Sequence, residues 1–215
     1  VELISDDGKS KVMVIPAWQG RVMTTSAAGD EGDSYGWINY SFIKKRQIDL
    51  QFNPVGGEER FWLGPEGGVF SLYFRQGEKQ IYKNWKVPPV LDIEAFKIQS
   101  QSKNCICLTK EGCLTNACGT TFYLNIKRTI SLLDINEFAA SFNLEFPKDI
   151  KAVAYKSDNQ ITNIGNESWN KETGLISVWM LSMFNPTSAT TVFIPYKQSR
   201  KGKIVNDEYF GKIPT

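Results

Sequence analysis

The sequence FYLNIKRTISLL, residues 122–133, alternates between two kinds of side chain along its length. One face carries mainly apolar side chains: Phe122, Leu124, Ile126, Arg128, Ile130 and Leu132. The other face carries Tyr123, Asn125, Lys127, Thr129 and Ser131. Successive residues of a strand point to opposite faces, so this period of two predicts a half-buried β-strand.

Other segments of the chain also have patterns typical of β-strands. After a break at residues 134–136, EFAASFNLEF (137–146) also alternates and predicts a second strand joined to the first by a short turn. Further strands are predicted from β-branched and aromatic content at KVMVIP (11–16), RVMTTSA (21–27), GVFSLYF (68–74), KNCICLT (103–109), LISVWMLSMF (175–184) and TTVFIPY (190–196). No helical stripe exceeds two turns. The sequence therefore predicts an all-β fold, an antiparallel β-sandwich, in a single domain spanning residues 1–215.

The composition of the chain excludes some classes of binding partner. The 215 residues include 25 basic and 23 acidic ones, for a net charge of +2. Nucleic-acid binding requires a concentrated basic surface, so no nucleic acid partner is expected. No apolar run reaches the roughly 18 residues that a membrane-spanning helix needs, so we expect no membrane span.

The chain contains no histidine. This excludes Ser-His-Asp and Cys-His nucleophiles and HExxH zinc sites. Acid–base chemistry would have to use Asp, Glu, Tyr, Lys or Cys side chains whose pKa values are shifted by burial or by neighbouring charges.

Four cysteines lie close together at Cys105, Cys107, Cys113 and Cys118. Three states are open: free thiols, one disulfide, or a metal site. A hairpin turn at Glu111-Gly112 would place Cys105 opposite Cys118, as a disulfide requires. The spacing lacks the two CxxC pairs of a typical zinc site, and we expect no metal and no cofactor.

Two irregular stretches are candidate functional loops. Residues 75–95, RQGEKQIYKNWKVPPVLDIEA, predict a long surface loop stiffened by Pro88-Pro89. Residues 157–173, SDNQITNIGNESWNKET, are rich in Asn and turn-forming residues. Such loops often carry function, and others only cover a sheet edge.

The most unusual segment is FNPVGGEERFWLGPEGG, residues 52–68. Two glycine pairs bracket acids, an arginine and a tryptophan, and glycine allows a positive φ or a close backbone approach. A tryptophan face combined with charged donors and acceptors suits a sugar, which has apolar C–H faces and hydroxyl groups. The alternative is a turn that closes the sandwich, with Arg60 paired to a neighbouring glutamate.

Three stretches together resemble a known family: GRVMTTSAAGDEGDSYGWIN, FNPVGGEERFWLGPEGGVFSLYF and GLISVWMLSMFNP followed by TTVFIPY. They resemble an uncharacterised family, found largely in Bacteroidetes, of the galactose mutarotase-like (aldose 1-epimerase-like) superfamily. The resemblance spans most of the chain and implies a β-supersandwich that binds carbohydrate on the concave face of a large sheet.

The sequence also departs from that superfamily. Its active epimerases use a histidine as general acid and a glutamate as general base. Here the strand after Gly174 begins Leu175-Ile176-Ser177 and holds no histidine. The base glutamate lies in a later part of the superfamily fold, so we expect this chain to be the N-terminal part of a longer domain that lacks its C-terminal strands.

These considerations predict a carbohydrate-binding protein without the usual catalytic histidine. The residues expected to line the concave face are Arg21, Asn39, Arg60, Trp62, Glu66 and Trp179. One of the tryptophans would stack on a sugar ring, the arginines would donate to hydroxyls or a carboxylate, and Glu66 would accept. The alternatives are an epimerase or other carbohydrate-active enzyme that uses carboxylates, and a structural or interaction module.

Two expectations concern the surroundings of the chain. A shortened sandwich has unpaired strand edges, so we expect a partner chain or a missing C-terminal segment to complete the sheet. The resemblance and the absence of an initial methionine predict a periplasmic or extracellular location, reached with an export signal that is then removed.

Overall fold

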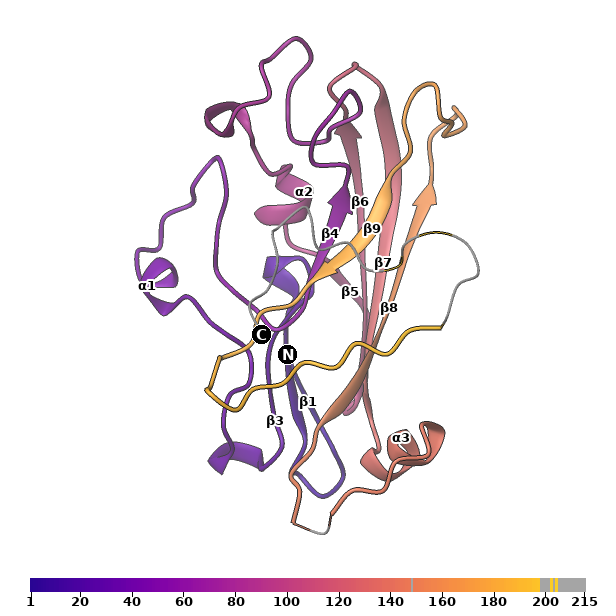
Figure 1. The fold of residues 1–215 in the computed structure, drawn as a ribbon. Helices are drawn as coiled ribbons and strands as arrows, with labels where there is room; N and C mark the ends of the chain where they lie inside the picture. Colours follow the sequence, from indigo (N-terminus) through magenta and orange to yellow (C-terminus); the bar gives the residue numbers. More distant parts are fainter. Residues whose placement is uncertain (148, 198–201, 203, 205–215) are drawn as a thin grey trace. The chain divides into compact units, whose positions relative to one another are not determined.

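The computed structural model describes residues 1–147, 149–197, 202 and 204. The chain divides into two compact units, Val1–Asn185 and Pro186–Thr215. All strands and helices of the described residues lie in the first unit (Figure 1). In the second unit, the backbone N–H of Thr187 donates to the hydroxyl of Thr190 at 2.9 Å, within a turn.

The largest sheet has four antiparallel strands in the order β5-β6-β7-β8. Its strands are β5 (Lys97–Gln101), β6 (Cys105–Thr115), β7 (Thr121–Leu133) and β8 (Ala154–Asn163). Every even-numbered side chain of β7 from Phe122 to Leu132 is buried. The alternation predicted for residues 122–133 is therefore confirmed.

Two smaller sheets complete the strands of this unit. One is three-stranded, in the order β1 (Glu2–Ile4), β2 (Lys11–Ile15) and β3 (Arg21–Ser26). In the other, β4 (Arg60–Gly64) pairs antiparallel with β9 (Ser177–Leu181). These strands confirm the predictions for residues 11–16, 21–27 and 175–184, as β6 does for 103–109.

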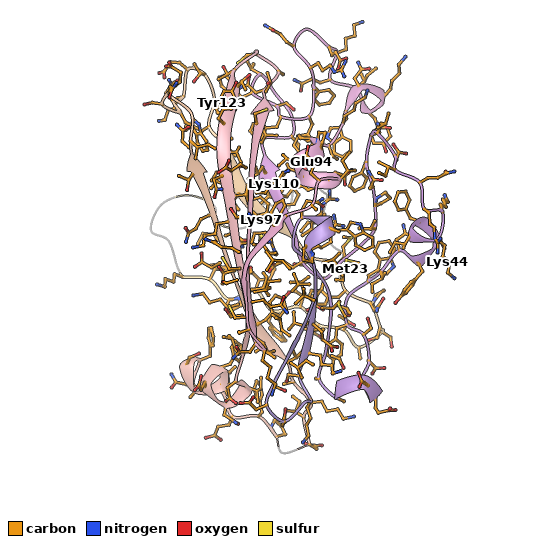
Figure 2. The ribbon with its side chains drawn as sticks, turned by 180° about the vertical axis from the view of Figure 1, so that it is seen from behind. Met23, Lys44, Glu94, Lys97, Lys110 and Tyr123 are labelled. Atoms are coloured by element: carbon orange, nitrogen blue, oxygen red, sulfur yellow. The ribbon has the colours of Figure 1, made fainter. Side chains whose placement is uncertain are left out.

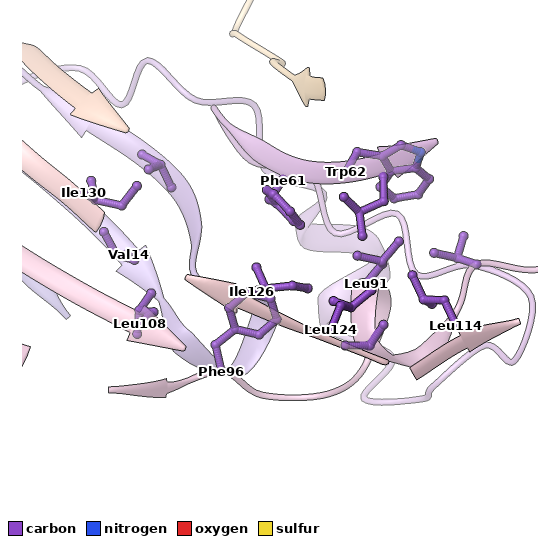
Figure 3. Close-up of a cluster of buried hydrophobic side chains, with 14 of the residues drawn as sticks. Val14, Phe61, Trp62, Leu91, Phe96, Leu108, Leu114, Leu124, Ile126 and Ile130 are labelled. Carbon is purple, nitrogen blue, oxygen red and sulfur yellow. The ribbon is translucent and has the colours of Figure 1, made fainter. Parts of the chain in front are cut away.

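The core lies between the smaller sheets and the four-stranded sheet. Figure 3 shows Val14 of β2 and Phe61 of β4 in one cluster with Leu108 of β6 and with Ile126 and Ile130 of β7. Burying apolar side chains of the smaller sheets against those of the four-stranded sheet stabilises this sandwich-like arrangement. The all-β, antiparallel, sandwich-like fold class is confirmed.

The helices are short. They are α1 (Tyr40–Ile43), α2 (Pro89–Asp92) and α3 (Ile135–Ser141), with 3-10 turns η1 (Pro16–Trp18), η2 (Gly29–Glu31) and η3 (Tyr82–Asn84). Across the described part of the chain, no helix has the length and apolar character needed to cross a membrane.

The strand predicted at 137–146 is wrong. Residues 135–141 form α3 instead, and no regular structure follows through residue 147. Asp134 caps the helix, because its carboxylate accepts from the backbone N–H groups of Asn136 at 2.8 Å and Glu137 at 3.0 Å. The cap and the adjacent alanines Ala139 and Ala140 favour helix over a short apolar alternation.

Two other predicted strands are also absent. Residues 68–74 form successive turns in which Ser71, Leu72, Tyr73 and Phe74 are all buried, unlike a strand with one solvent face. Residues 190–196 form no strand, and Val192, Phe193 and Ile194 are exposed. Their β-branched and aromatic content did not predict the structure, because strand preference depends largely on packing against neighbours.

No hairpin turn forms at Glu111-Gly112, so the cysteine pairing that would have depended on it is absent. Strand β6 continues through both residues, which pair with Asn125 and Leu124, and the chain turns at residues 116–120. The side-chain oxygen of Asn116 stabilises that turn by accepting from backbone N–H groups within it. Cys105 therefore lies opposite Ser131 rather than Cys118, and all four cysteines are free thiols.

Each of the two predicted loops contains some regular secondary structure. Strand β8 takes the first part of 157–173, and the loop proper begins after Asn163. In 75–95, residues 75–86 form a loop with mostly exposed residues, while Val87, Val90 and Leu91 enter the core. Helix α2 begins at Pro89, and Pro88 immediately precedes it. This start is as expected, because a proline disfavours helix in the residue before it.

Candidate functional site

The six residues predicted to contact a sugar lie on or beside four elements of the first unit. Arg60 and Trp62 are in β4, Glu66 follows β4, Trp179 is in β9, Arg21 begins β3, and Asn39 caps α1. Three of them, Arg60, Glu66 and Trp179, each contact Trp62, and the four residues are called the tryptophan cluster below.

The tryptophan cluster is held together by direct contacts. Trp62 and Trp179 are cross-strand partners whose rings meet edge to face at 6.0 Å. The indole N–H of Trp62 donates to Oε1 of Glu66 at 2.6 Å. The guanidinium of Arg60 lies over the Trp62 ring, 4.1 Å from its centroid, in a cation–π contact. The donor of Trp62 and one face of its ring are thus already engaged inside the protein.

Arg60 is paired with an acid outside its own motif. Its Nη2 lies 2.8 Å from Oδ1 of Asp92 in α2, and both side chains are buried. The other oxygen of Asp92 accepts from the backbone and side-chain nitrogens of Asn53 at 2.9 and 2.7 Å. Burial lowers the pKa of Arg60, and the charge of Asp92 opposes that shift. The ion pair therefore fastens α2 and residue 53 to β4.

Arg21 is buried beneath the first glycine pair. Its Nη1 donates to the backbone oxygen of Gly56 at 2.6 Å. Burial, together with the nearby positive charge of Arg60, lowers the pKa of Arg21 to about 8. A Cβ at Gly57 would lie 2.5 Å from Cδ of Arg21. The glycine is required because the backbone passes directly over the arginine.

Gly56 and Gly57 both have positive φ, of 87° and 118°. A Cβ at Gly56 would overlap the backbone oxygen of Trp37. The glycines thus give both the positive φ and the close approach expected of them. Asn39 lies nearby, where its side-chain nitrogen donates to the backbone oxygen of Pro54 at 2.9 Å and its oxygen caps α1.

The predicted site residues differ in how accessible they are to a ligand. Arg21 and Arg60 are each 1% exposed and Trp62 is 3% exposed, so their side chains contact only protein. Glu66 and Trp179 are half-buried and form the accessible margin of the tryptophan cluster. Arg60 is paired with an acid, as the alternative interpretation of the motif expected, but the partner is Asp92 rather than a neighbouring glutamate.

A second polar cluster surrounds Glu59 and Arg128 and was not predicted. Nη2 of Arg128 lies 2.8 Å from Oε1 of Glu59, and Oγ of Ser157 donates to Oε2 at 2.8 Å. Two nitrogens of Arg128, Nε and Nη1, are buried without a hydrogen-bond partner among the described residues, as is Oδ1 of Asn159. Asn159 is the cross-strand partner of Arg128, so unused donors and an unused acceptor occur on paired residues.

Glu58 adjoins this cluster and has a different electrostatic state. Its carboxylate accepts from the hydroxyl of Thr25 at 3.1 and 2.9 Å. Burial raises the pKa of Glu58 to about 7, and the charge of Glu59 adds to the shift. Glu58 can therefore exchange a proton near neutral pH. Glu58 is only 3% exposed, so a substrate would reach it only after neighbouring groups move.

The sequence contained a signal for this cluster. Glu58 and Glu59 lie within residues 52–68, between the glycine pairs, but were not selected. The alternation of β7 also placed Arg128 on the apolar face, where a buried arginine requires an anionic partner. Sequence spacing did not identify that partner, because Glu59 lies 69 residues away.

An open pocket of about 470 Å³ lies where β7 begins and β8 ends. It is lined by Thr121, Tyr123, Asn163, Ile164, Gly165, Asn166, Glu167 and Trp169, and is called the Tyr123 pocket. Figure 2 shows Tyr123 on β7, and its ring is 55% exposed. The pocket thus combines an accessible aromatic ring with amide and carboxylate groups.

The loop that forms this pocket is internally braced. Asn163 accepts from the backbone N–H of Gly165 at 2.9 Å and donates to the backbone oxygen of Glu167 at 2.8 Å. Trp169 packs edge to face on Phe122 of the core, with ring centroids 5.7 Å apart. These contacts hold the loop in place, as a preformed binding site requires.

A search for metal-binding groups among the described residues found no cluster of three or more Cys, Asp or Glu side chains. Comparisons with known proteins gave one match. The model of the family described as "Family of unknown function (DUF6786)" matches residues 1–215. No curated protein and no solved structure matches the chain.

Proposed function

We propose that this chain, which belongs to the DUF6786 family of unknown function, is a carbohydrate-binding protein that holds a neutral sugar in the Tyr123 pocket. The observation that carries the proposal is the exposed ring of Tyr123 beside Asn166 and Glu167, whose side chains make no hydrogen bond within the described residues. An apolar ring face with free amide and carboxylate groups is complementary to a sugar.

The size of the pocket supports the proposal. Ligand pockets range over about 300–1,000 Å³, and the Tyr123 pocket of about 470 Å³ falls within that range. Tyr123 would lie under the C–H face of a sugar ring, Asn166 would donate and accept, and Glu167 would accept from hydroxyls. The half-buried indole of Trp169 forms another wall.

The resemblance of three segments to the galactose mutarotase-like superfamily also supports carbohydrate as the ligand class. On this proposal the antiparallel sheets form part of a supersandwich. The tryptophan cluster then acts mainly as the support of β4, with Glu66 and Trp179 as its accessible members.

Titration with a panel of neutral mono- and oligosaccharides tests the proposal, with intrinsic tryptophan fluorescence, to which Trp169 at the pocket contributes, as the reporter. Tyr123→Ala is expected to weaken binding at least about tenfold, because an aromatic platform is typically a dominant contact. Tyr40→Ala is the matched control, since Tyr40 is similarly exposed but lies on α1. No response to any sugar, or equal affinities for wild type and Tyr123→Ala, would refute the proposal.

A further inference from the structure

A second pocket, of about 480 Å³, lies between residues 72–89 and the end of β6. Its apolar part includes Leu72, Val87 and Leu114. Its charged lining residues are Arg75 and Lys86, and no Asp or Glu lines it. This pocket, called the cationic pocket, contributes two positive charges and amide groups around an apolar floor.

The loop that forms one side of this pocket is basic throughout. Residues 75–86 contain four basic residues, Arg75, Lys79, Lys83 and Lys86, and one acid, Glu78. Within the described residues, none of the four lies within 4.0 Å of a carboxylate. Lys110, on β6, differs in this respect, because it is paired with Glu94 at 2.6 Å (Figure 2). The charges of the loop are therefore free to attract an anion.

The basic loop is anchored to the core by stacked rings. Tyr82 stacks on Trp85 with centroids 6.2 Å apart, and Trp85 stacks on Tyr73 at 5.5 Å. The hydroxyl of buried Tyr73 donates to the backbone oxygen of Leu63 in β4 at 2.6 Å. The ring stack connects exposed Tyr82 with the interior, so the loop's basic side chains extend from a fixed backbone.

We propose that the cationic pocket binds an acidic oligosaccharide, with carboxylates of uronic acid units paired to Arg75 and Lys86. The apolar floor accepts sugar C–H faces, and Asn84 and Gln76 face the hydroxyls from the pocket lining. A nucleic acid fits less well, because the whole chain has a net charge of only +2 and the basic residues belong to one loop. This proposal concerns a different pocket and a different ligand chemistry from the Tyr123 pocket.

Calorimetric titration with trigalacturonate and with its fully methyl-esterified form tests the proposal. The two probes share their sugar rings and differ in charge. The acid is expected to bind at least about tenfold more tightly than the ester, and its affinity is expected to fall as salt is raised.

Arg75→Gln and Lys86→Gln are each expected to weaken binding of the acid about fivefold, and the double variant more. Lys44→Gln, at the residue that follows α1, removes the same charge outside the pocket and is expected to leave the affinity unchanged. All the substituted side chains are exposed, and unfolding curves verify that each variant folds.

Three results would overturn the proposal. They are no binding of trigalacturonate at millimolar concentration, equal affinity for the acid and its ester, and equal losses in Lys44→Gln and the pocket variants. Binding of a single-stranded oligonucleotide without binding of trigalacturonate would also overturn it and would assign the basic loop to nucleic acid.

Discussion

The ion pair between Arg60 and Asp92 allows a direct test of how burial changes the contribution of an ion pair to the free energy of unfolding. Nη2 of Arg60 lies 2.8 Å from Asp92, and the side chains are 1% and 3% exposed. Lys103 and Asp6 lie at the same distance of 2.8 Å, with Lys103 55% exposed and Asp6 fully exposed. The two pairs have equal separation, so solvent access is the main difference between them.

Asp92→Asn removes the negative charge and leaves the size of the side chain almost unchanged. Arg60 then remains as a buried cation without a counter-charge, which costs about 3–5 kcal/mol. The total stability of a domain is about 5–15 kcal/mol, so about a fifth of it or more would be lost. Lys103→Gln breaks an exposed pair and is expected to cost no more than about 1 kcal/mol.

Urea unfolding followed by tryptophan fluorescence measures both variants. With a slope of about 2–3 kcal/mol per molar urea, Asp92→Asn is expected to lower the midpoint by about 1–2.5 M. Adding Arg60→Met to Asp92→Asn should restore part of the loss, because the unpaired charge is removed. If Asp92→Asn costs no more than Lys103→Gln, or if the second substitution adds a further full loss, the argument from buried charge is refuted.

Two further predictions concern residues between β3 and β4. Burial raises the pKa of Glu58 from 4.5 to about 7, so between these pH values the folded protein keeps a proton that the unfolded chain loses, and stability falls as pH rises. Glu58→Gln should remove ~3 kcal/mol of this fall, measured by urea unfolding at both pH values; parallel profiles of variant and wild type would contradict it. Gly56→Ala should cost about 1–3 kcal/mol, because φ is positive and a Cβ meets the oxygen of Trp37. Its control is Gly67→Ala, where the nearest atom would be 3.8 Å from the Cβ; equal thermal shifts in the two variants would show that the close approach is unimportant.

The predictions from sequence succeeded where one local pattern determined the structure. Strand β7 was predicted because its buried and exposed positions alternate without interruption over residues 122–132. The pattern at 137–146 was equally regular, but it did not determine the structure. The cap at Asp134 started a helix there. Alternation records which positions could face a core, and the capping residue decided which structure formed.

The candidate site was harder to predict, because its contacts join residues far apart in the sequence. The tryptophan cluster could be anticipated in part, since Arg60, Trp62 and Glu66 belong to one segment. The partner of Arg60 is 32 residues away, and no spacing rule connects the two. The Tyr123 pocket was missed because Tyr123 was assigned only to the polar face of its strand.

The positions of these residues separate two kinds of role. Arg21, Arg60 and Trp62 are buried against protein groups, so substitutions there should act first on the stability of β4 and its neighbours. The Tyr123 pocket and the cationic pocket instead lie beside the same hairpin, since Cys113 of the cationic pocket is the cross-strand partner of Tyr123. A sandwich core can hold the base of that hairpin fixed while the loops around its tip differ in charge. The proposed neutral-sugar site and the proposed acid-sugar site can therefore occur together at one end of the sheet, and substitutions that remove either should leave the buried ion pairs undisturbed.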